Sequence, residues 1–302
     1  MIAIDLGSNT LRMVEYDGKT WGKTFEKIVR TAQGLDHTRR IDPRAIERIV
    51  LAIEEAKTLL NFEGQTIVAV TTAAMRMAHN SHEVREVFRQ RTGIHFRVIT
   101  GEEEAKLTLM AVQHRLNALG ITSPSWALVD IGGGSTEIIV VTGEKIDAKS
   151  LPFGIVTMSE SGDSKGRLTL FREALLEALP ENIPKTLVLT AGTPTTMAAY
   201  LHGMTYATYD PHRINGTTLK ASDCGEILDA LRAMDESTRA TYVGVGREQL
   251  IITGIAMVES VFHALGCDEA VVVDDGLREG VALNHVKLAL SRSQAPAWEC
   301  IG

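Results

Sequence analysis

The chain has 302 residues, of which 44% are hydrophobic and 23% charged, and its formal net charge is −7. This length and composition are typical of a globular protein with about two domains. The negative charge argues against a general nucleic-acid or acidic-membrane binder, because such proteins need a basic face. A local group of arginines could still bind a polyanion, since exposed charges are screened beyond ~8–10 Å at physiological salt.

Cysteine content and hydropathy indicate the compartment. The three cysteines, Cys224, Cys267 and Cys300, are odd in number and show neither zinc spacing nor a disulfide framework. No apolar run approaches the ~18 residues of a membrane-spanning helix, and no signal-peptide pattern opens the chain. These features predict a cytoplasmic protein that binds neither membrane nor nucleic acid.

The first part of the chain, residues 1–120, predicts one α/β lobe. Short apolar runs at 2–4 and 11–14 flank a polar turn, and a third strand is expected at 28–30. A helix should begin at Asp42-Pro43, an N-cap followed by proline at the first helical position. The remaining elements are a strand at 67–71, helical segments at 73–78 and 81–91, the second of them stopped by Gly93, and a strand at 96–99.

A long helix over 102–119, stopped by Gly120, is expected to join this lobe to a second one over residues 121–302. The second lobe should contain strands near 126–129, 138–142, 146–151, 186–189 and 270–273 and helices near 168–179, 222–233, 248–265 and 277–290. No low-complexity linker separates the halves. We therefore expect two similar lobes with a cleft between them, and the last helix could pack back on the first lobe.

One short motif occurs twice, as Asp-Leu-Gly-Ser-Asn-Thr from Asp5 and as Asp-Ile-Gly-Gly-Gly-Ser-Thr from Asp130. Each copy lies between two apolar runs, which predicts a strand, a turn and a returning strand. Glycines let backbone N–H groups converge on a phosphate, and hydroxyls add donors. The duplication predicts two phosphate-binding turns, made of Gly7, Ser8, Asn9 and Thr10 in the first and Gly132, Gly133, Gly134, Ser135 and Thr136 in the second.

Charged residues near these turns complete a candidate site. Arg12 follows Asp5 by seven residues, just as Glu137 follows Asp130. A hairpin could bring Asp130 and Glu137 to one side, where a hard cation such as Mg²⁺ would bind carboxylate oxygens and phosphate together. Arginines bind phosphate oxygens bidentately and stay charged, so the phosphate-binding candidates also include Arg12, Arg76 and, more weakly, Arg247.

Hydrolysis of a phosphoanhydride also needs a base within reach of a water molecule. The candidates are Glu102, Glu103 and Glu104 at the start of the long helix. Consecutive helical residues point ~100° apart, so at most one or two of them can enter a site. Acidic residues also stabilise helix N-termini through the helix dipole, which is the structural alternative.

With these motifs, the chain resembles the actin/hexokinase/Hsp70 superfamily and, within it, the exopolyphosphatase / guanosine pentaphosphate phosphohydrolase (Ppx/GppA) family. The resemblance rests on ordered blocks at 5–12, 71–76, 101–105, 130–137, 151–154, 191–193 and 275–280. It implies an α/β fold of two actin-like (ribonuclease H-like) lobes with an active-site cleft between them. The chain has no His-Asp dipeptide, so it is similar to the short, two-domain form.

The resemblance also implies roles for individual residues. Glu104 matches the family's base, with Glu103 as the alternative if the register differs by one. Asp130 and Glu137 match the magnesium ligands, and Asp5 is the second choice for the metal. Two positions depart from the family pattern: Gln249 stands where an aspartate usually follows Arg247, and the turn at 191–195 has fewer glycines.

The expected function is therefore a hydrolase that releases the terminal orthophosphate from inorganic polyphosphate, or converts guanosine pentaphosphate (pppGpp) to ppGpp. The sequence does not separate these two substrates, and it leaves a homodimer open. One alternative is an ATP-dependent small-molecule kinase of the same superfamily. Another is a non-catalytic, nucleotide-dependent assembly protein. The blocks at 101–105 and 275–280 argue against the kinase.

Overall fold

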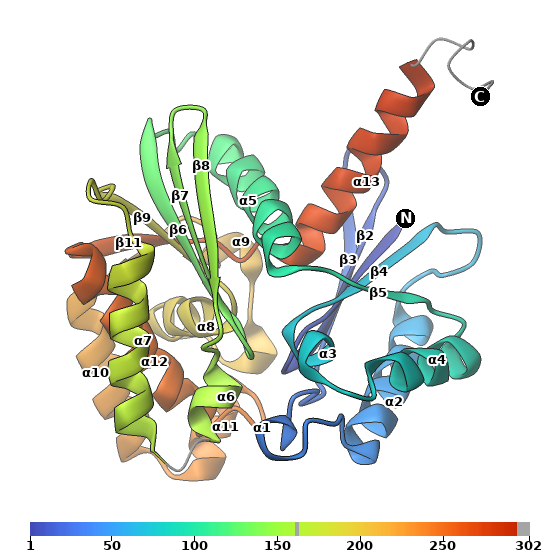
Figure 1. Cartoon of the computed structure of the whole chain (residues 1–302), viewed down its shortest axis with the longest axis horizontal. Coiled ribbons are helices and arrows are strands. Elements are labelled where there is room, and N and C mark those ends of the chain that lie inside the picture. The colour runs from blue at the N-terminus through green and yellow to red at the C-terminus, as the bar shows by residue number, and fades with distance from the viewer. Residues whose placement is uncertain (161–162, 295–302) are drawn as a thin grey trace.

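The computed structural model describes residues 1–160 and 163–294. Two β-sheets stand beside each other, and helices cover their faces (Figure 1). Within these described ranges, no helix combines the length and the apolar character that crossing a membrane requires.

The first sheet has five strands in the order β3-β2-β1-β4-β5. The central strand β1 (Ile2–Leu6) pairs antiparallel with β2 (Thr10–Tyr16) and parallel with β4 (Ile67–Thr71). The edges are β3 (Trp21–Ile28) and β5 (Phe96–Val98). The strand expected at 28–30 instead ends at Ile28, because Arg30 has a φ of 51°, which an extended strand does not accept.

Helices α2 (Pro43–Leu59) and α4 (Ser81–Thr92) pack beside this sheet, with the short α1 (Leu35–Thr38) and α3 (Ala73–Met77) before each. The Asp42 side chain caps α2 by accepting a hydrogen bond from the backbone N–H of Arg44, as the sequence predicted. Gly93 ends α4 in the left-handed region, with a φ of 74°.

The second sheet has six strands in the order β10-β11-β9-β6-β7-β8. Its strands are β6 (Ser125–Ile131), β7 (Thr136–Thr142), β8 (Lys145–Leu151), β9 (Thr186–Thr190), β10 (Thr217–Lys220) and β11 (Glu269–Val272). Without β10, the order repeats that of the first sheet, with β6 in the place of β1 and β7 in the place of β2. The duplicated motif therefore belongs to a duplicated sheet.

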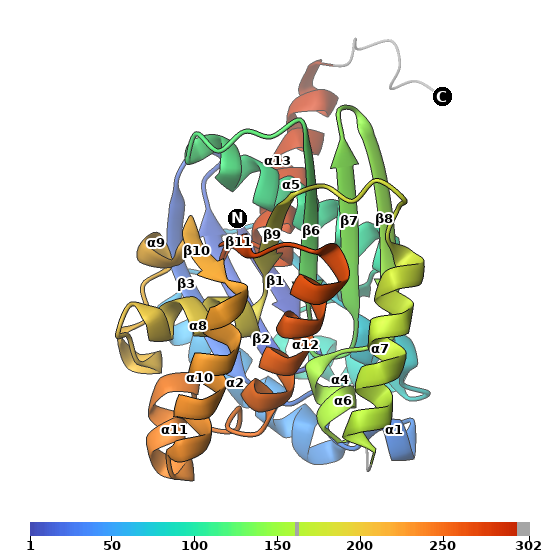
Figure 2. The same cartoon turned by 90° about the vertical axis from the view of Figure 1, so that its left-hand side faces the viewer.

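The second lobe also contains a larger set of helices. They are α6 (Ile155–Ser159), α7 (Ser164–Ala178), α8 (Gly192–Leu201), α9 (Pro211–Ile214), α10 (Ala221–Ala233), α11 (Glu236–Val243) and α12 (Leu250–Leu265), with a 3₁₀ turn at Tyr206–Thr208. Figure 2 shows α7, α10 and α12 side by side in front of the sheet. The sequence did not predict α8, because most of its residues are buried and it has no polar stripe to give a helical period.

Two helices, α5 (Gly101–Ala118) and α13 (Leu277–Gln294), lie between the sheets in Figure 1. The apolar face of α5, with Ala105 and Leu109, packs against β6 and β7 of the second sheet. The face of α13 with Val281 packs against β1 and β2 of the first sheet. A Cβ on Gly280 would lie 2.0 Å from the carbonyl oxygen of Leu107, so the glycine permits the two helices to touch. Each sheet is thus covered by the helix that follows the other sheet in the chain.

Candidate active site

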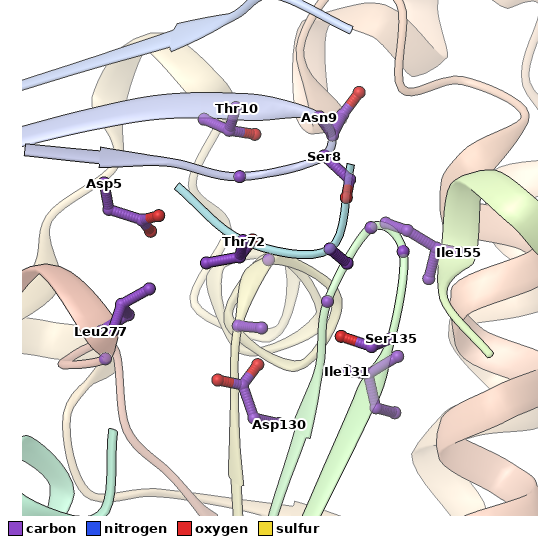
Figure 3. A pocket seen from close by; sticks show the side chains of 18 of the residues that line it. Asp5, Ser8, Asn9, Thr10, Thr72, Asp130, Ile131, Ser135, Ile155 and Leu277 are labelled. Atoms are coloured by element: carbon purple, nitrogen blue, oxygen red, sulfur yellow. The ribbon is translucent and has the colours of Figure 1, made fainter. Parts of the chain in front are cut away.

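The two polar turns meet between the lobes and enclose a cavity of about 100 Å³. Figure 3 shows Asp5 and Asp130 on opposite sides of this space, with Thr72 between them and Leu277 beside them. The lining comprises Asp5, Gly7, Ser8, Asn9, Thr10, Arg12, Thr72, Ala73, Glu104, Asp130, Ile131, Gly132, Gly133, Gly134, Ser135, Ile155, Thr190, Ala191, Gly192, Arg247, Gly276 and Leu277.

The two turns have the same local geometry. In the first, the N–H of Gly7 donates to the carbonyl of Thr10 at 3.0 Å, and in the second, the N–H of Gly132 donates to the carbonyl of Ser135 at 2.9 Å. The turns also touch each other, because a Cβ on Gly134 would lie 2.5 Å from the Oγ of Ser8. Glycine at this position therefore permits the close approach of the two lobes.

A third segment supports the second turn from behind. The N–H groups of Ile155 and Val156, at the start of α6, donate to the carbonyls of Gly132 and Gly133 at 3.0 and 2.8 Å. A Cβ on Gly154 would lie 2.3 Å from the backbone nitrogen of Gly134. This contact explains why the block at 151–154 ends in glycine.

Strand pairing fixes the charged residues next to the turns. Arg12 is the direct partner of Asp5 in the β1–β2 ladder, and Glu137 is the direct partner of Asp130 in the β6–β7 ladder. Asp5, Arg12 and Asp130 line the cavity. Glu137 is buried behind it, where its Oε1 accepts a hydrogen bond from the Oγ of Ser150 at 2.7 Å. Thr136 also lies behind the lining, and its hydroxyl donates to the carbonyl of Phe153.

Of the three glutamates at the start of α5, Glu104 enters the cavity. Its side chain is buried, and its Oε2 accepts a hydrogen bond from Nη1 of Arg76 at 2.8 Å. Burial raises the pKa of Glu104 to about 7, and the charge of Arg76 opposes this rise. A carboxyl group with this pKa, beside a phosphate-sized space, can take a proton from water near neutral pH.

The other two glutamates point outward. Both oxygens of Glu103 accept hydrogen bonds from the guanidinium of Arg97, at 2.7 and 2.6 Å, and this contact lowers the pKa of Glu103. Glu102 pairs with Lys106 one turn along the helix at 2.7 Å. The geometry favours neither of them as a base.

The predicted phosphate-binding arginines have different surroundings. Arg12 and Arg247 line the cavity. A Cβ on Gly192 would lie 2.2 Å from Nη2 of Arg247, so this glycine makes room for the guanidinium. Arg76 does not belong to the lining, because its Nη1 is held by the carbonyl of Ile99 at 2.9 Å and by Glu104. The structure therefore places Arg76 behind the candidate base.

The pKa values and contacts of the buried carboxylates show whether the cavity fits the predicted magnesium ion. Burial raises the pKa of Asp5 to about 7 and that of Asp130 to about 6. The pKa of Glu137 is also raised, by burial and then by the charges of Glu104 and Asp130. Oδ1 of Asp5 is buried and has no hydrogen-bond partner within residues 1–160 and 163–294. An oxygen-binding cation fits this shortage of positive charge.

The protein does not supply a complete set of metal ligands, however. Across the described ranges, no group of three or more His, Cys, Asp and Glu side chains could hold a metal ion. Mg²⁺ commonly uses one or two carboxylates and completes its coordination with phosphate and water oxygens. The carboxylates that line the cavity, Asp5 and Asp130, fit that arrangement, while Glu137 lies one layer further back.

Sequence reasoning missed Glu26, which carries no motif. It is the direct partner of Arg12 in the β2–β3 ladder, and its Oε2 lies 3.1 Å from Nε of Arg12. Nε of Arg12 has no hydrogen-bond partner within residues 1–160 and 163–294, so this contact is an ion pair. Its other oxygen, Oε1, lies 3.9 Å from Nη1 of Arg247. Burial would raise the pKa of Glu26, but the charges of Arg12, Arg247 and Arg278 outweigh it and hold the pKa low.

A second cavity of about 250 Å³ adjoins the first and shares Arg12 and Arg247 with it. Its walls contain aromatic rings and two carboxylates as well as these arginines. The lining comprises Arg12, Thr24, Glu26, Thr195, Thr196, Ala199, Tyr206, Tyr209, Pro211, Tyr242, Arg247, Asp274 and Arg278. The cations are largely neutralised there, since Arg12 pairs with Glu26 and Arg278 pairs with Glu279.

Comparison with known proteins gives a consistent result. The profile of the Ppx/GppA phosphatase family matches residues 23–289. Exopolyphosphatase 2 of Mycobacterium tuberculosis is 30% identical, over 93% of this chain and 97% of that protein. The crystal structure of the Aquifex aeolicus Ppx/GppA family member superposes with a TM-score of 0.73 at 27% identity, covering 97% of this chain and 98% of that one. An exopolyphosphatase-like protein of known structure gives a TM-score of 0.82 at 25% identity, covering 95% of this chain and 99% of that one. The predicted α/β fold of two actin-like lobes is thereby confirmed.

Proposed function

Because the chain belongs to the Ppx/GppA phosphatase family, we propose that it releases the terminal orthophosphate from inorganic polyphosphate. The observation that carries this proposal is the position of Glu104. Its buried carboxylate, with a pKa near 7, faces a small cavity whose other walls are two glycine-rich turns and two arginines. The name of the mycobacterial relative, exopolyphosphatase 2, supports polyphosphate as the substrate.

The reaction follows from these positions. The terminal phosphoryl group lies between the two turns, where backbone N–H groups and Arg12 stabilise its oxygens. Glu104 accepts a proton from a water molecule as the water oxygen forms a bond to the terminal phosphorus. The bond from phosphorus to the bridging oxygen breaks, and the shortened chain leaves with the electron pair. Arg76 orients Glu104 and keeps part of it ionised near neutral pH.

We also propose that a divalent cation, with Mg²⁺ the first choice, takes part. Asp130 and Asp5 would hold it at the cavity, and Glu137 would support it from behind. When bound, such a cation offsets negative charge on the phosphate oxygens. The raised pKa values of the two aspartates and the unpartnered Oδ1 of Asp5 support this proposal.

The second cavity favours pppGpp as a second candidate substrate. Three tyrosines, Tyr206, Tyr209 and Tyr242, offer ring faces, and Glu26 and Asp274 offer acceptors for the N–H groups of a base. A bare polyphosphate chain would use neither feature. Replacing Tyr206 with alanine should therefore weaken hydrolysis of pppGpp and leave hydrolysis of tripolyphosphate unchanged.

One assay separates the candidate functions. The protein is incubated with polyphosphate, with pppGpp, and with ATP plus a panel of sugars, and orthophosphate and ADP are both measured. Release of orthophosphate from polyphosphate without ADP formation is the expected result. ADP formation that depends on a sugar would instead establish the kinase alternative.

A further inference from the structure

A group of arginines lies on the segment that follows β3 and on the first part of α2, and Arg30 in this group contacts the first turn. Within residues 30–48 the chain carries Arg30, Arg39, Arg40, Arg44 and Arg48, although the whole protein has a net charge of −7. Arg40 pairs with Glu83 at 3.1 Å, and Nε of Arg44 lies 3.8 Å from Asp42. Arg30 and Arg48 form no ion pair with any carboxylate in the described part of the chain.

Arg30 lies against the loop that carries Arg247. A Cβ on Gly246 would be 1.9 Å from Nη2 and 2.6 Å from Cζ of Arg30, so the guanidinium rests on the backbone immediately before Arg247. Gly246 has a φ of 89°, a conformation that favours glycine. Arg30 therefore lies next to the loop that supplies Arg247 to the active-site cavity, and the N–H of Gly246 in this loop donates to Oε1 of Glu248 at 2.8 Å.

The backbone holds Arg30 in an unusual conformation. Its φ is 51°, and few residues other than glycine adopt such a value. Its N–H donates to the carbonyl of Asn9 at 2.9 Å, which ties Arg30 to the first phosphate-binding turn. No hydrogen bond from its guanidinium to protein is present in the described ranges. A strained residue with a free guanidinium next to a binding site indicates a functional constraint.

Arg48, on α2, lies beside Arg30. Its Nε donates to the carbonyl of Val29 at 2.9 Å and its Nη2 to the carbonyl of Arg30 at 3.3 Å. Burial lowers the pKa of Arg48, and the neighbouring charge of Arg30 lowers it further. Nη2 of Arg48 also donates to Oε1 of Gln33 at 3.0 Å, and the charge of Asp42 opposes the fall in the pKa of Arg48. A bound anion would offset the remaining charge of these two arginines.

We propose that Arg30, supported by Arg48, binds phosphate groups of a polyphosphate chain that follow the terminal group in the cavity. This inference rests on the proposed function. A long chain has to leave the small active-site cavity, and Arg30 lies beside both the first turn and the loop of Arg247, which line that cavity. Arginine suits this contact, because its guanidinium binds phosphate oxygens bidentately and stays charged. The exposed Arg39 and Arg44 add positive charge to the same part of the chain.

The test compares substrates of different length. Arg30→Asn removes the charge, and asparagine tolerates the left-handed conformation at this position. For long-chain polyphosphate we expect KM to rise ~5–10-fold, which corresponds to loss of about one charge-assisted contact. For tripolyphosphate, which has only two phosphates behind the terminal group, kcat and KM should stay within ~2-fold. Arg40→Gln, on the same segment but paired with Glu83, is the matched control and should behave as wild type.

A binding measurement separates this inference from the proposed function. Long-chain polyphosphate is titrated calorimetrically into Glu104→Gln and into the double variant Glu104→Gln/Arg30→Asn. Weaker binding by the double variant, with a shallower dependence on salt, supports the inference even if the wild type hydrolyses no polyphosphate. Equal binding by the two proteins overturns it, and so does an equal loss of activity on short and long chains. In both cases the role of Arg30 would be limited to holding the backbone next to Asn9 in its conformation.

Discussion

Arg12 and Glu137 occupy the same position in the two halves of the molecule, each directly opposite the aspartate of its turn. The two turns are alike in backbone, but one is followed by a guanidinium and the other by a carboxylate. In the proposed function, a phosphate in the cavity would meet the guanidinium of Arg12 from the first lobe, whereas Glu137, one layer behind the cavity, adds to the carboxylates that favour a cation in the second. This asymmetry would give the bound substrate a defined orientation.

The assignment of Glu104 as the base predicts a large loss of turnover in Glu104→Gln. The amide keeps the shape of the side chain but cannot accept the proton, so kcat should fall ~10²–10⁴-fold. Polyphosphate binding should be retained. Glu103→Gln is the control, because Glu103 is bound to Arg97 on the outside of the helix. Near-normal turnover of Glu104→Gln with an inactive Glu103→Gln would mean that the register is off by one.

The contact between Arg76 and Glu104 predicts a pH-dependent defect in Arg76→Lys. Lysine keeps the charge but cannot bind both the Ile99 carbonyl and Glu104 with the geometry of arginine. The pKa of Glu104 should rise, so activity should fall ~5–10-fold at pH 6 but only ~2-fold at pH 9. A pH–rate profile of kcat measures this.

The control for this variant is Arg97→Lys, which changes the equivalent exposed pair with Glu103. A different outcome would change the role that we assign to Arg76. If Arg76→Lys raises KM at every pH and leaves the profile of kcat unmoved, the residue contacts the phosphate directly, as the sequence predicted.

The buried carboxylates predict that stability falls between pH 5 and pH 8. Burial raises the pKa of Asp5 and Glu104 to about 7, above their usual values of 3.8 and 4.5. In this range the folded protein keeps protons that the unfolded chain has released, so the free energy of unfolding decreases as pH rises. Calorimetric Tm values at pH 5 and pH 8, without divalent cations, test this. The decline should be shallower in Glu104→Gln, and a Tm that rises over this range would contradict it.

The proposed cation predicts that activity disappears in chelator and returns with Mg²⁺. Asp130→Asn removes one negative charge from the cavity, so the Mg²⁺ concentration for half-maximal activity should increase. Titrations of the wild type and the variant are compared side by side. Superimposed curves would show that Asp130 only shapes the turn, and that any cation arrives bound to the polyphosphate.

Much of the fold could be predicted because the signals were local. The Asp42-Pro43 cap, the stop at Gly93 and the duplicated turns each specify a conformation through neighbouring residues. The helix at Gly192–Leu201 could not be predicted, since a helix that is buried along most of its length loses the alternation of polar and apolar residues. The early end of β3 depends on the unusual φ of Arg30, which no local pattern indicates.

The candidate site likewise contains residues that local signals indicate and residues that only the packing of the chain brings together. Asp5 and Asp130 were identified because glycines mark their neighbourhoods. The helix start indicated the three glutamates at 102–104, and the family resemblance selected Glu104 among them. Asp5, Asp130 and Glu104 all line the cavity. Glu26 was missed, because its importance arises only when β3 pairs with β2 and a loop of the second lobe brings Arg247 to it. The position of Arg76 behind Glu104 likewise depends on tertiary contacts of Arg76 with the carbonyl of Ile99 and with Glu104 itself, which spacing alone does not reveal.

The exchange of helices between the lobes has a consequence for biosynthesis. The face of the first sheet that α13 covers includes Ala3 and Val14. This face lacks its covering helix until the entire second lobe has been translated. We therefore expect the nascent first lobe to remain unfinished on the ribosome and to be a client for chaperones. An isolated fragment of residues 1–120 should aggregate or stay partly unfolded, and adding a peptide of α13 should rescue it.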